Sequence, residues 1–225
     1  MVVSALALVL TGCGPTQVAR GTGRPRASPP IERPGWPRHE VLDLALRAHR
    51  CGRETGTFDG PLLTVIDYSL PSTEPRLWVI DVDRRQVLFR ELVAHGRGSG
   101  EDRASAFSND PGSHQSSLGL FRTSATYNGG NGYSLRLDGL EDGVNDRARE
   151  RLIVMHGANY VDEGFARVKG RLGRSWGCPA VRREVSRPLI DRIKGGSALF
   201  VYYPDSHWLQ DSAFLQCDRV RMARR

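Results

Sequence analysis

Between residues 38 and 50 the apolar side chains recur every three or four positions. The residues that would share one helical face are Val41, Leu42, Ala45, Leu46 and His49. A stripe of this kind is typical of a surface helix that packs against a core. We therefore predict a short amphipathic helix over this segment.

After Pro61 the pattern changes to short apolar and β-branched runs, which predict strands. The predicted strands are residues 62–70, 76–82, 87–93, 117–124, 134–140, 151–156 and 197–203. Four polar residues, 83–86, separate the second run from the third, and this spacing predicts a β-hairpin.

The remaining segments connect these strands. Residues 96–114 are rich in Gly, Ser, Asn and Asp, and a loop of this length in a compact domain is often functional. Residues 184–194 predict a helix ended by Gly195-Gly196, in which Pro188 is tolerable only in the first turn. Residues 159–173 are helix or loop. Many short strands and few helices predict a mainly β fold, a sandwich or barrel of mostly antiparallel strands with a few peripheral helices.

The first thirteen residues form an apolar run that ends in Leu10-Thr11-Gly12-Cys13. The run has the length of a signal-peptide core and is too short to span a bilayer as a mature helix. Its end resembles the lipobox of bacterial lipoproteins, although no basic residue precedes the run. We expect residues 1–13 to direct export, with Cys13 either lipidated or removed with a cleaved leader.

Residues 14–37 contain six of the 13 prolines together with Arg, Gly, Ser and Thr. This composition cannot bury a core and predicts an extended linker. The chain carries a formal net charge of +7, but four Arg in residues 1–37 and four in 218–225 account for the excess. The body, residues 38–217, is nearly neutral, so we expect no nucleic-acid partner and a basic tail at 218–225.

Four cysteines are present, and lipidation of Cys13 would leave three. Cys51 and Cys217 bracket the predicted domain of residues 38–217, whose core is 61–217. A disulfide between them would persist in an oxidising compartment. The spacing does not prove this pairing. If it forms, Cys178 is left as the odd thiol.

The segment around Cys178 has the composition of an acyl-transfer site. Gly177 permits backbone conformations closed to other residues, and the amides of Gly177 and Cys178 would converge on a developing oxyanion. A thiol must ionise before it attacks, and an imidazole is its usual activator. His156 ends an apolar strand that precedes Gly157, so it is the best-placed base. One Cys and one His are by themselves more consistent with structural roles than with a catalytic pair.

The motifs His156-Gly157 and Ser175-x-Gly177-Cys178 resemble the signature of the YkuD-type L,D-transpeptidases. Residues 62–217 are similar to a divergent branch, the murein L,D-transpeptidase catalytic domain family. The segments that carry this closer resemblance are Asp67-Tyr68-Ser69-Leu70-Pro71, His95-Gly96-Arg97, residues 113–117 and residues 173–179. The resemblance implies a YkuD-like fold.

The resemblance also implies a mechanism. Cys178 would attack a carbonyl of a peptidoglycan stem peptide and release the terminal D-amino acid, with His156 taking the thiol proton. The carbonyl of Gly157 or the hydroxyl of Ser175 would orient the imidazole, and the Gly177 and Cys178 amides would hold the oxyanion. No metal and no organic cofactor is required.

Two positions depart from the main branch of the family. Trp176 occupies the place of a second His, and Ala180 the place of an Arg two residues after the nucleophile. If that Arg holds a substrate carboxylate, Arg174 or Arg136 would replace it here. The other residues expected to touch substrate are Trp176, His114 and Ser117, although His114 is equally consistent with an ordinary loop contact.

The apolar leader and its lipobox-like end predict export to the bacterial cell envelope, with the protein periplasmic and lipid-anchored. The expected partners are the membrane, through the anchor, and stem peptides, which the family resemblance implies. Two alternatives stay open. Water in place of an amine would make the chain an L,D-carboxypeptidase or a cysteine peptidase on the same scaffold. Given the two departures, it could also be a non-catalytic lipoprotein that binds peptidoglycan.

Overall fold

A computed structural model of the protein describes residues 1–2 and 35–217. The chain divides into two units, Met1–Pro30 and Ile31–Arg225. The architecture below is that of the second unit alone.

Some of the sequence-based expectations concern other residues. The export signal with Cys13, nearly all of the linker 14–37 and the basic tail 218–225 lie outside the described residues. In the part of the chain that the structure describes, no helix has the length and apolarity needed to cross a bilayer.

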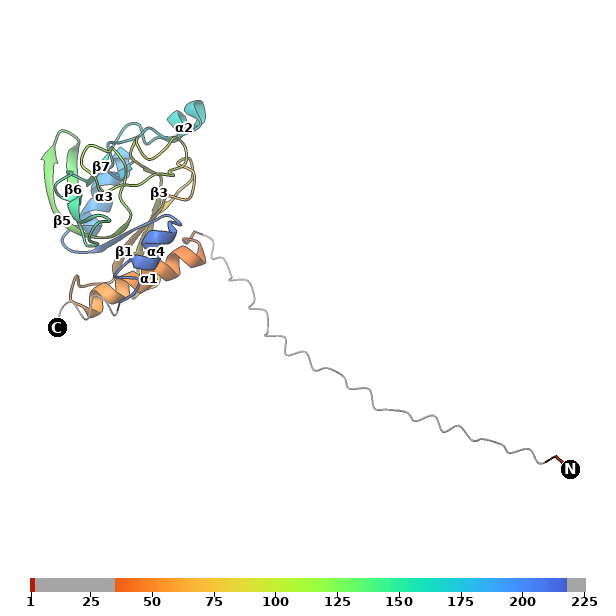
Figure 1. Ribbon diagram of the computed structural model, residues 1–225. Helices are drawn as coiled ribbons and strands as arrows, with labels where there is room; N and C mark the ends of the chain where they lie inside the picture. The colour runs from red at the N-terminus through yellow and green to blue at the C-terminus, as the bar shows by residue number, and fades with distance from the viewer. Residues whose placement is uncertain (3–34, 218–225) are drawn as a thin grey trace. The chain divides into compact units, whose positions relative to one another are not determined.

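A mixed sheet forms the centre of the second unit (Figure 1). Its strands are β1 (Leu62–Asp67), β2 (Leu77–Asp81), β3 (Gln86–Glu91), β4 (Val93–Ala94), β5 (Gly119–Gly129), β6 (Gly132–Gly139), β7 (Val154–Gly157), β8 (Ala180–Val181) and β9 (Ala198–Tyr202). Their order is β3-β2-β1-β9-β5-β6-β7-β8-β4. Because Leu92 alone separates β3 from β4 along the chain, the two ends of this order are adjacent and the sheet nearly closes on itself. This barrel-like sheet confirms the predicted mainly β fold.

Most neighbouring strands are antiparallel, as predicted. Among the described strands, only the pairs β1–β9 and β7–β8 are parallel. Both parallel pairs join segments far apart in the sequence, and the second of them carries the predicted chemistry. The sheet therefore brings residues 154–157 and 178–181 side by side.

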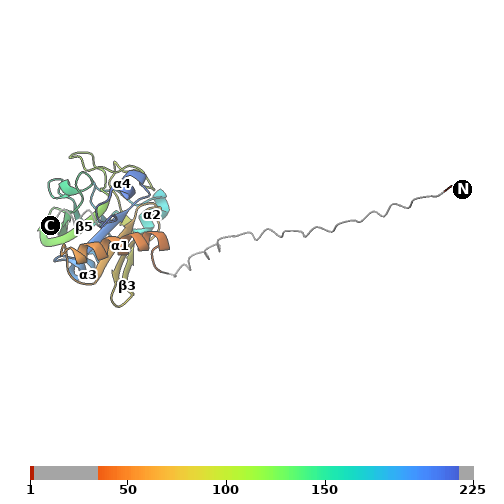
Figure 2. The same ribbon diagram turned by 60° about the horizontal axis from the view of Figure 1, so that its bottom comes forward.

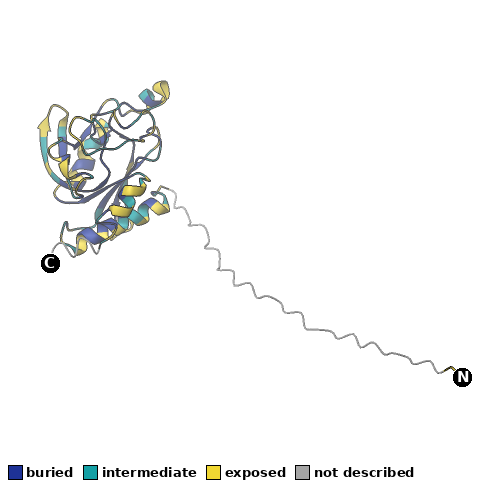
Figure 3. Cartoon of the chain, in the orientation of Figure 1, coloured by how far each residue is buried: buried dark blue, intermediate teal, exposed yellow. Residues whose placement is uncertain are grey.

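The helix α1 (His39–Glu54) covers one face of the sheet at β1 and β9 (Figure 2). Its inward side chains Val41, Ala45 and Ala48 are fully buried, and their small size allows a close approach of helix to sheet. Strands covered on both faces read as continuous apolar runs, and β1, β2 and β9 are buried along nearly their whole length (Figure 3). The predicted amphipathic helix is confirmed, with four more residues at its C-terminal end.

Three further α-helices are short and peripheral: α2 (Glu163–Lys169), α3 (Arg183–Ile193) and α4 (Ser206–Asp211). A 3₁₀ turn, η1 (Asp146–Ala148), precedes β7. The helix α3 contains Pro188 in its middle, so the expectation that this proline lies in a first turn was wrong. A proline lacks the backbone N–H that would make one i→i−4 hydrogen bond. Here that N–H would have donated to the carbonyl of Glu184, a residue exposed to solvent.

The strands β5 and β6 form one long hairpin that is exposed at its tip. The sequence pattern predicted two shorter strands here, residues 117–124 and 134–140. The extra length comes from polar residues that pair through the backbone, such as Tyr127 with Ser134. The strands β4 and β8 were not predicted, because two residues carry no periodicity.

The structure joins Cys51 in α1 to Cys217 in a disulfide with Cα atoms 5.5 Å apart. Among the described cysteines, Cys178 is therefore the free thiol. The bond closes almost the whole domain into one covalent loop, with a sequence separation of 166.

Removal of this disulfide should lower the free energy of unfolding, because the unfolded chain gains conformational entropy without the cross-link. For a loop of this length we expect a loss of about 3–5 kcal/mol in the Cys51→Ser/Cys217→Ser variant, or a fall in Tm of roughly 6–20 °C. Thermal melting with Cys178→Ser as the matched control measures it, because that cysteine closes no loop. Equal Tm values for the double variant and the wild type would contradict the expectation.

Candidate active site

The turn Ser175–Cys178 is closed by the side chain of its first residue. Ser175 Oγ accepts a hydrogen bond from the N–H of Gly177 at 3.1 Å and donates one to the carbonyl of Cys178 at 2.6 Å. Its backbone N–H donates to the carbonyl of His95 at 3.0 Å, and its carbonyl accepts from Arg97 N–H at 2.8 Å. The turn that carries the thiol is thus fixed at both ends.

Gly177 lies where no other residue fits. Its φ is +116°, and a Cβ there would lie 2.8 Å from the carbonyl oxygen of Gln115 and 3.0 Å from Ile153 Cδ1. The carbonyl of Gly177 accepts a hydrogen bond from Ser116 Oγ at 3.0 Å. A side chain at this position would push the turn away from residues 115–116 and displace Cys178.

The thiol of Cys178 is partly buried and lies against the start of β7. Sγ accepts from the backbone N–H of Val154 at 3.4 Å and donates to the carbonyl of Leu152 at 3.6 Å. Burial raises the pKa of the thiol above its ordinary value, while the Val154 N–H and the charge of Arg151 oppose this shift. The resting thiol is therefore protonated at neutral pH and needs a base.

His156 supplies a neutral imidazole on the adjacent strand. It is buried, with 4% of its surface exposed, and burial together with the charge of Arg183 lowers its pKa below the ordinary value. Nδ1 lies 3.2 Å from the carbonyl of Gly157. Because a carbonyl can only accept, Nδ1 carries the proton and Nε2 keeps the lone pair that a base requires.

The strand register brings the two groups to neighbouring positions. His156 pairs with Ala180 in the parallel β7–β8 ladder, and two residues back along both strands Val154 contacts Cys178. Cys178 thus lies diagonally across from His156. In the described part of the chain Sγ makes its hydrogen bonds to the backbone of Leu152 and Val154 rather than to the imidazole. A loose pair of this kind is usual without substrate.

Two predicted residues have other partners than expected. The Ser175 hydroxyl bonds within its own turn and not to the imidazole, so of the two predicted partners it is Gly157 that contacts Nδ1. The N–H of Gly177 donates to Ser175 Oγ and is not free for an oxyanion. A tight turn consumes the amide of its own interior residue, which the sequence pattern does not reveal.

Sequence reasoning missed Arg151, which lies at the edge of the site. Its guanidinium donates to the carbonyls of Ser108 and Gln115 and to the hydroxyls of Ser113 and Ser117, at 2.6–3.2 Å. All these acceptors lie in the loop before β5, so Arg151 holds that loop in place. No local signal marks this residue, because its partners are 34 to 43 positions away.

A buried polar network supports the turn from behind. Arg76 is completely buried and donates to the carbonyls of Leu70 and Val93 and to His95 Nδ1, the last at 2.7 Å. Its guanidinium lies 5.0 Å from the ring centre of Tyr68. Burial lowers the pKa of Arg76 to about 10, and burial together with this neighbouring charge lowers the pKa of His95 to about 4. His95 is therefore neutral, and its Nδ1 accepts a hydrogen bond from the guanidinium.

The network reaches the nucleophile through Ser116. Its hydroxyl accepts from the N–H of Gly96 at 3.0 Å and donates to the carbonyl of Gly177. Tyr68 lies beside it, and burial raises the pKa of this phenol to about 12. Three of the segments that carried the family resemblance thus meet behind Cys178.

The residues expected to touch substrate are not all brought together. Arg174 pairs with Glu101 at 2.6 Å, and Arg136 lies over the ring of Tyr127 on the β5–β6 hairpin at 4.5 Å. Ser117 is buried, donates to the carbonyl of Ser108 and accepts from Arg151.

Trp176 and His114 do meet, and Trp176 lies in the turn that carries Cys178. Their ring centres are 5.1 Å apart, and 68% of the surface of Trp176 is exposed.

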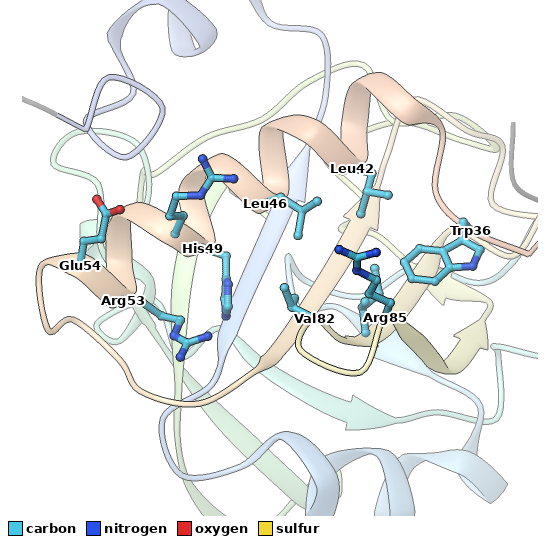
Figure 4. A pocket seen from close by; sticks show the side chains of 10 residues that line it. Trp36, Leu42, Leu46, His49, Arg53, Glu54, Val82 and Arg85 are labelled. Atoms are coloured by element: carbon cyan, nitrogen blue, oxygen red, sulfur yellow. The ribbon is translucent and has the colours of Figure 1, made fainter. Parts of the chain in front are cut away.

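A cavity of about 590 Å³ opens elsewhere, between α1 and the β2–β3 hairpin (Figure 4). Leu42, Leu46 and His49 point into it from α1, opposite Val82 and Arg85. Its lining contains none of the predicted site residues. Within residues 1–2 and 35–217, no group of three or more His, Cys, Asp or Glu side chains is arranged to hold a metal ion.

Ser116 offers a test of the network behind the turn. Ser116→Ala removes the hydrogen bond to the Gly177 carbonyl and leaves that buried group unpaired, which should cost about 1–3 kcal/mol of stability. It should also slow alkylation of Cys178 by iodoacetamide several-fold, because the turn loses its support.

Ser197→Ala is the matched control, since Ser197 Oγ likewise donates to a buried carbonyl, that of Ile193, at 2.6 Å. We expect unchanged alkylation in this variant and a smaller destabilisation, because Thr123 Oγ1 still donates to the Ile193 carbonyl at 2.6 Å. Equal alkylation rates in both variants would show that Ser116 does not position the turn.

Comparisons with known proteins agree with this picture. A family model described as L,D-transpeptidase catalytic domain matches residues 36–202. No curated protein sequence matches the chain.

Several solved structures are similar in fold. One is an L,D-transpeptidase from Mycobacterium smegmatis, with 13% identity, a TM-score of 0.40 and coverage of 64% of this chain and 59% of that one. An L,D-transpeptidase from Stackebrandtia nassauensis shares 15% identity with a TM-score of 0.39, covering 73% and 67%. A fused Zn-dependent amidase/peptidase/peptidoglycan-binding domain-containing protein from Clostridium acetobutylicum shares 14% identity with a TM-score of 0.38, covering 72% and 62%.

The chain spans 59% of the length of the mycobacterial structure. The family model, by contrast, covers most of this chain, from the tryptophan ahead of α1 to the end of β9. The protein therefore belongs to the L,D-transpeptidase catalytic domain family.

Proposed function

We propose that the protein is a cysteine acyltransferase that acts on peptidoglycan stem peptides, with Cys178 as nucleophile and His156 as base. The observation that carries the proposal is the position of a free thiol against the strand that holds a neutral imidazole. The Gly157 carbonyl holds Nδ1–H, so Nε2 is the nitrogen left to take a proton.

The first step forms a thioester. Rotation about the single χ1 of Cys178 turns Sγ from the β7 backbone toward His156, whose Nε2 takes the thiol proton. The thiolate attacks the stem carbonyl on the L-centre, and the backbone N–H of Cys178 donates to the oxyanion. The C–N bond then breaks, and the imidazolium returns its proton to the departing amine of the terminal D-amino acid.

The second step resolves the thioester. An amine from an acceptor attacks the carbonyl, His156 takes its proton, and the C–S bond breaks to give a new amide and the Cys178 thiolate, which is then reprotonated by the imidazolium. Water in place of the amine would give a carboxylate and a trimmed stem. The charge of Arg151 favours the thiolate in both steps.

We also propose that this chemistry takes place outside the cytoplasm, in a protein exported through residues 1–13 and anchored at Cys13. The Cys51–Cys217 disulfide supports export, because such bonds persist in oxidising compartments. The lipobox-like sequence around Cys13 supports the anchor.

Mass spectrometry of the protein with a tetrapeptide-stem muropeptide tests the mechanism. We expect an adduct on Cys178 that equals the muropeptide minus its terminal D-amino acid. Cys178→Ala should show no adduct, and His156→Gln should form it at least 100-fold more slowly, the usual loss for a general base. Absence of the adduct in the wild type, or its presence in Cys178→Ala, would refute the assignment. Cross-linked dimers as products would indicate transfer, and trimmed monomers would indicate hydrolysis.

The pH dependence of the reaction follows from the shifted pKa values of His156 and Cys178. Because the base form of His156 is needed and its pKa is lowered, acylation should be lost only as the pH falls through a midpoint below about 6.5. The pKa of the free thiol is raised, so alkylation by iodoacetamide without substrate should keep rising above about pH 8.5. Stopped-flow measurements from pH 4 to 10 give the rate of acylation and the rate of alkylation as functions of pH. An alkylation rate already on a plateau at pH 6 would indicate a resting thiolate–imidazolium pair and contradict this assignment.

A further inference from the structure

Three side chains form an exposed surface next to the nucleophile: Arg97, His114 and Trp176. We call this surface the Arg97 shelf. Trp176 directly precedes Gly177 and Cys178 in the turn, and its indole is largely exposed. A large exposed aromatic ring beside a reactive group has no role in packing the core, and such patches often mark binding sites.

The backbone fixes the shelf to the turn. Arg97 N–H donates to the carbonyl of Ser175 at 2.8 Å, and Gly98 N–H donates to the carbonyl of His114 at 3.0 Å. Gly96 makes this approach possible, because a Cβ there would collide with the His114 carbonyl and lie 2.8 Å from Gly177 Cα. Any change in the position of the turn therefore moves the shelf with it.

The side chains of the shelf also hold one another. Arg97 Nε and Nη2 donate to His114 Nδ1 at 3.2 and 2.9 Å. The guanidinium lies 5.4 Å from the ring centre of Trp176, and the imidazole packs against the same indole in a tilted arrangement. With Nδ1 as acceptor, the neutral imidazole carries its proton on Nε2. Nη1 of Arg97 and Nε2–H of His114 remain as donors.

His114 is held in a strained conformation to complete this arrangement. Its φ is +53°, a left-handed value that non-glycine residues adopt rarely and at some cost. The surroundings of the shelf thus maintain a geometry that the local chain does not favour. Residues held in this way are concentrated at ligand clamps and active sites.

The charge of Arg97 is not neutralised by the protein. Among the described residues, no carboxylate lies within ion-pair distance of its guanidinium, whereas Arg174 and Arg171 share Glu101. Arg151 directs its donors to the loop before β5. Arg97 is therefore a cation at the mouth of the site with open hydrogen-bonding groups.

The reaction proposed above brings an anion to this place. The departing D-amino acid carries an α-carboxylate, which only the amide nitrogen and Cα separate from the attacked carbonyl. When that carbonyl is at Sγ of Cys178, the carboxylate must lie beside the turn. A guanidinium with free N–H groups is the side chain best matched to a carboxylate.

We propose that the Arg97 shelf binds the terminal carboxylate of the stem peptide. Arg97 pairs with the carboxylate, His114 donates from Nε2, and the face of Trp176 covers the aliphatic part of the leaving residue. This assignment rests on the proposed function, because it takes the leaving group from it. It makes Arg97 the residue that selects stems ending in a free D-amino acid.

The test compares a tetrapeptide stem ending in a carboxylate with the same stem ending in a carboxamide. Wild-type protein should form the thioester with the carboxylate stem about 10- to 100-fold more efficiently in kcat/KM. Arg97→Gln should bring this ratio close to 1, chiefly through KM of the carboxylate stem, and Arg97→Lys should restore part of it. Arg149→Gln is the control, since Arg149 pairs with Asp138 on the surface and should leave the ratio unchanged.

Three competing arginines make the assignment falsifiable. If the ratio collapses in Arg174→Gln, Arg136→Gln or Arg183→Gln while Arg97→Gln keeps it, another cation binds the carboxylate and the proposal is overturned. An unchanged ratio in Arg97→Gln overturns it as well.

Calorimetric titration of Cys178→Ala protein with both stems separates binding from chemistry. Cys178→Ala protein should bind the carboxylate stem more tightly than the carboxamide stem, and adding Arg97→Gln should remove this difference. That result supports the shelf even if the wild type forms no thioester. Absence of the thioester would refute only the mechanism. A thioester formed without any preference would refute the shelf and leave the mechanism standing.

Discussion

The pairing of residues 95–97 with Ser175 is the contact on which the arrangement around Cys178 depends. It fixes the turn Ser175–Cys178 against the loop before β5, and these two segments are far apart along the chain. The contact requires a residue without a side chain at Gly96, because its Cβ site is filled by the His114 carbonyl and by Gly177. Gly96 and Gly177 pack against each other, so the backbones of three chain segments come into contact. The nucleophile and the Arg97 shelf both lie on those segments.

Behind this contact the protein buries a full positive charge without a carboxylate partner among the described residues. A buried charge is costly unless its hydrogen bonds are satisfied, and Arg76 satisfies its own with carbonyls, a neutral imidazole and the face of Tyr68. Burial together with the same charge keeps His95 neutral. The pKa values of His95 and His156 are both lowered, yet only one of them suits a base. His95 uses the Nδ1 lone pair to accept from Arg76, whereas His156 donates from Nδ1 and retains its lone pair at Nε2.

The sequence pattern predicts helices and strands whose apolar positions repeat along the chain, and sites that contain an uncommon residue type. The alternating runs predicted seven of the nine strands, and the helical stripe predicted α1, because periodicity and burial are coupled in a packed fold. It could not predict β4 and β8, although these short strands align His156 with Cys178. The site shows the same division. Gly177 and Cys178 are recognisable locally, whereas Arg76, Ser116 and Arg151 act through partners many residues away. The different partner of Ser175 has the same origin, since a hydroxyl that closes its own turn is no longer available to a neighbour.

The two departures from the main branch of the family have a common physical explanation in this fold. Ala180 is completely buried between β7 and β4, packed with Ala94 and Ala158. An arginine there would place a guanidinium in an apolar cluster, at a cost that the small pocket could not offset. A cation for the substrate must then come from another segment, and the segment paired with the thiol turn is residues 95–97. Trp176 fits the same change, because an indole gives Arg97 a flat face to lie on. Charge is thereby divided between two arginines. Arg151, whose donors are consumed, acts on the thiol through its field, and Arg97, whose donors are open, is the one that we propose to face the substrate.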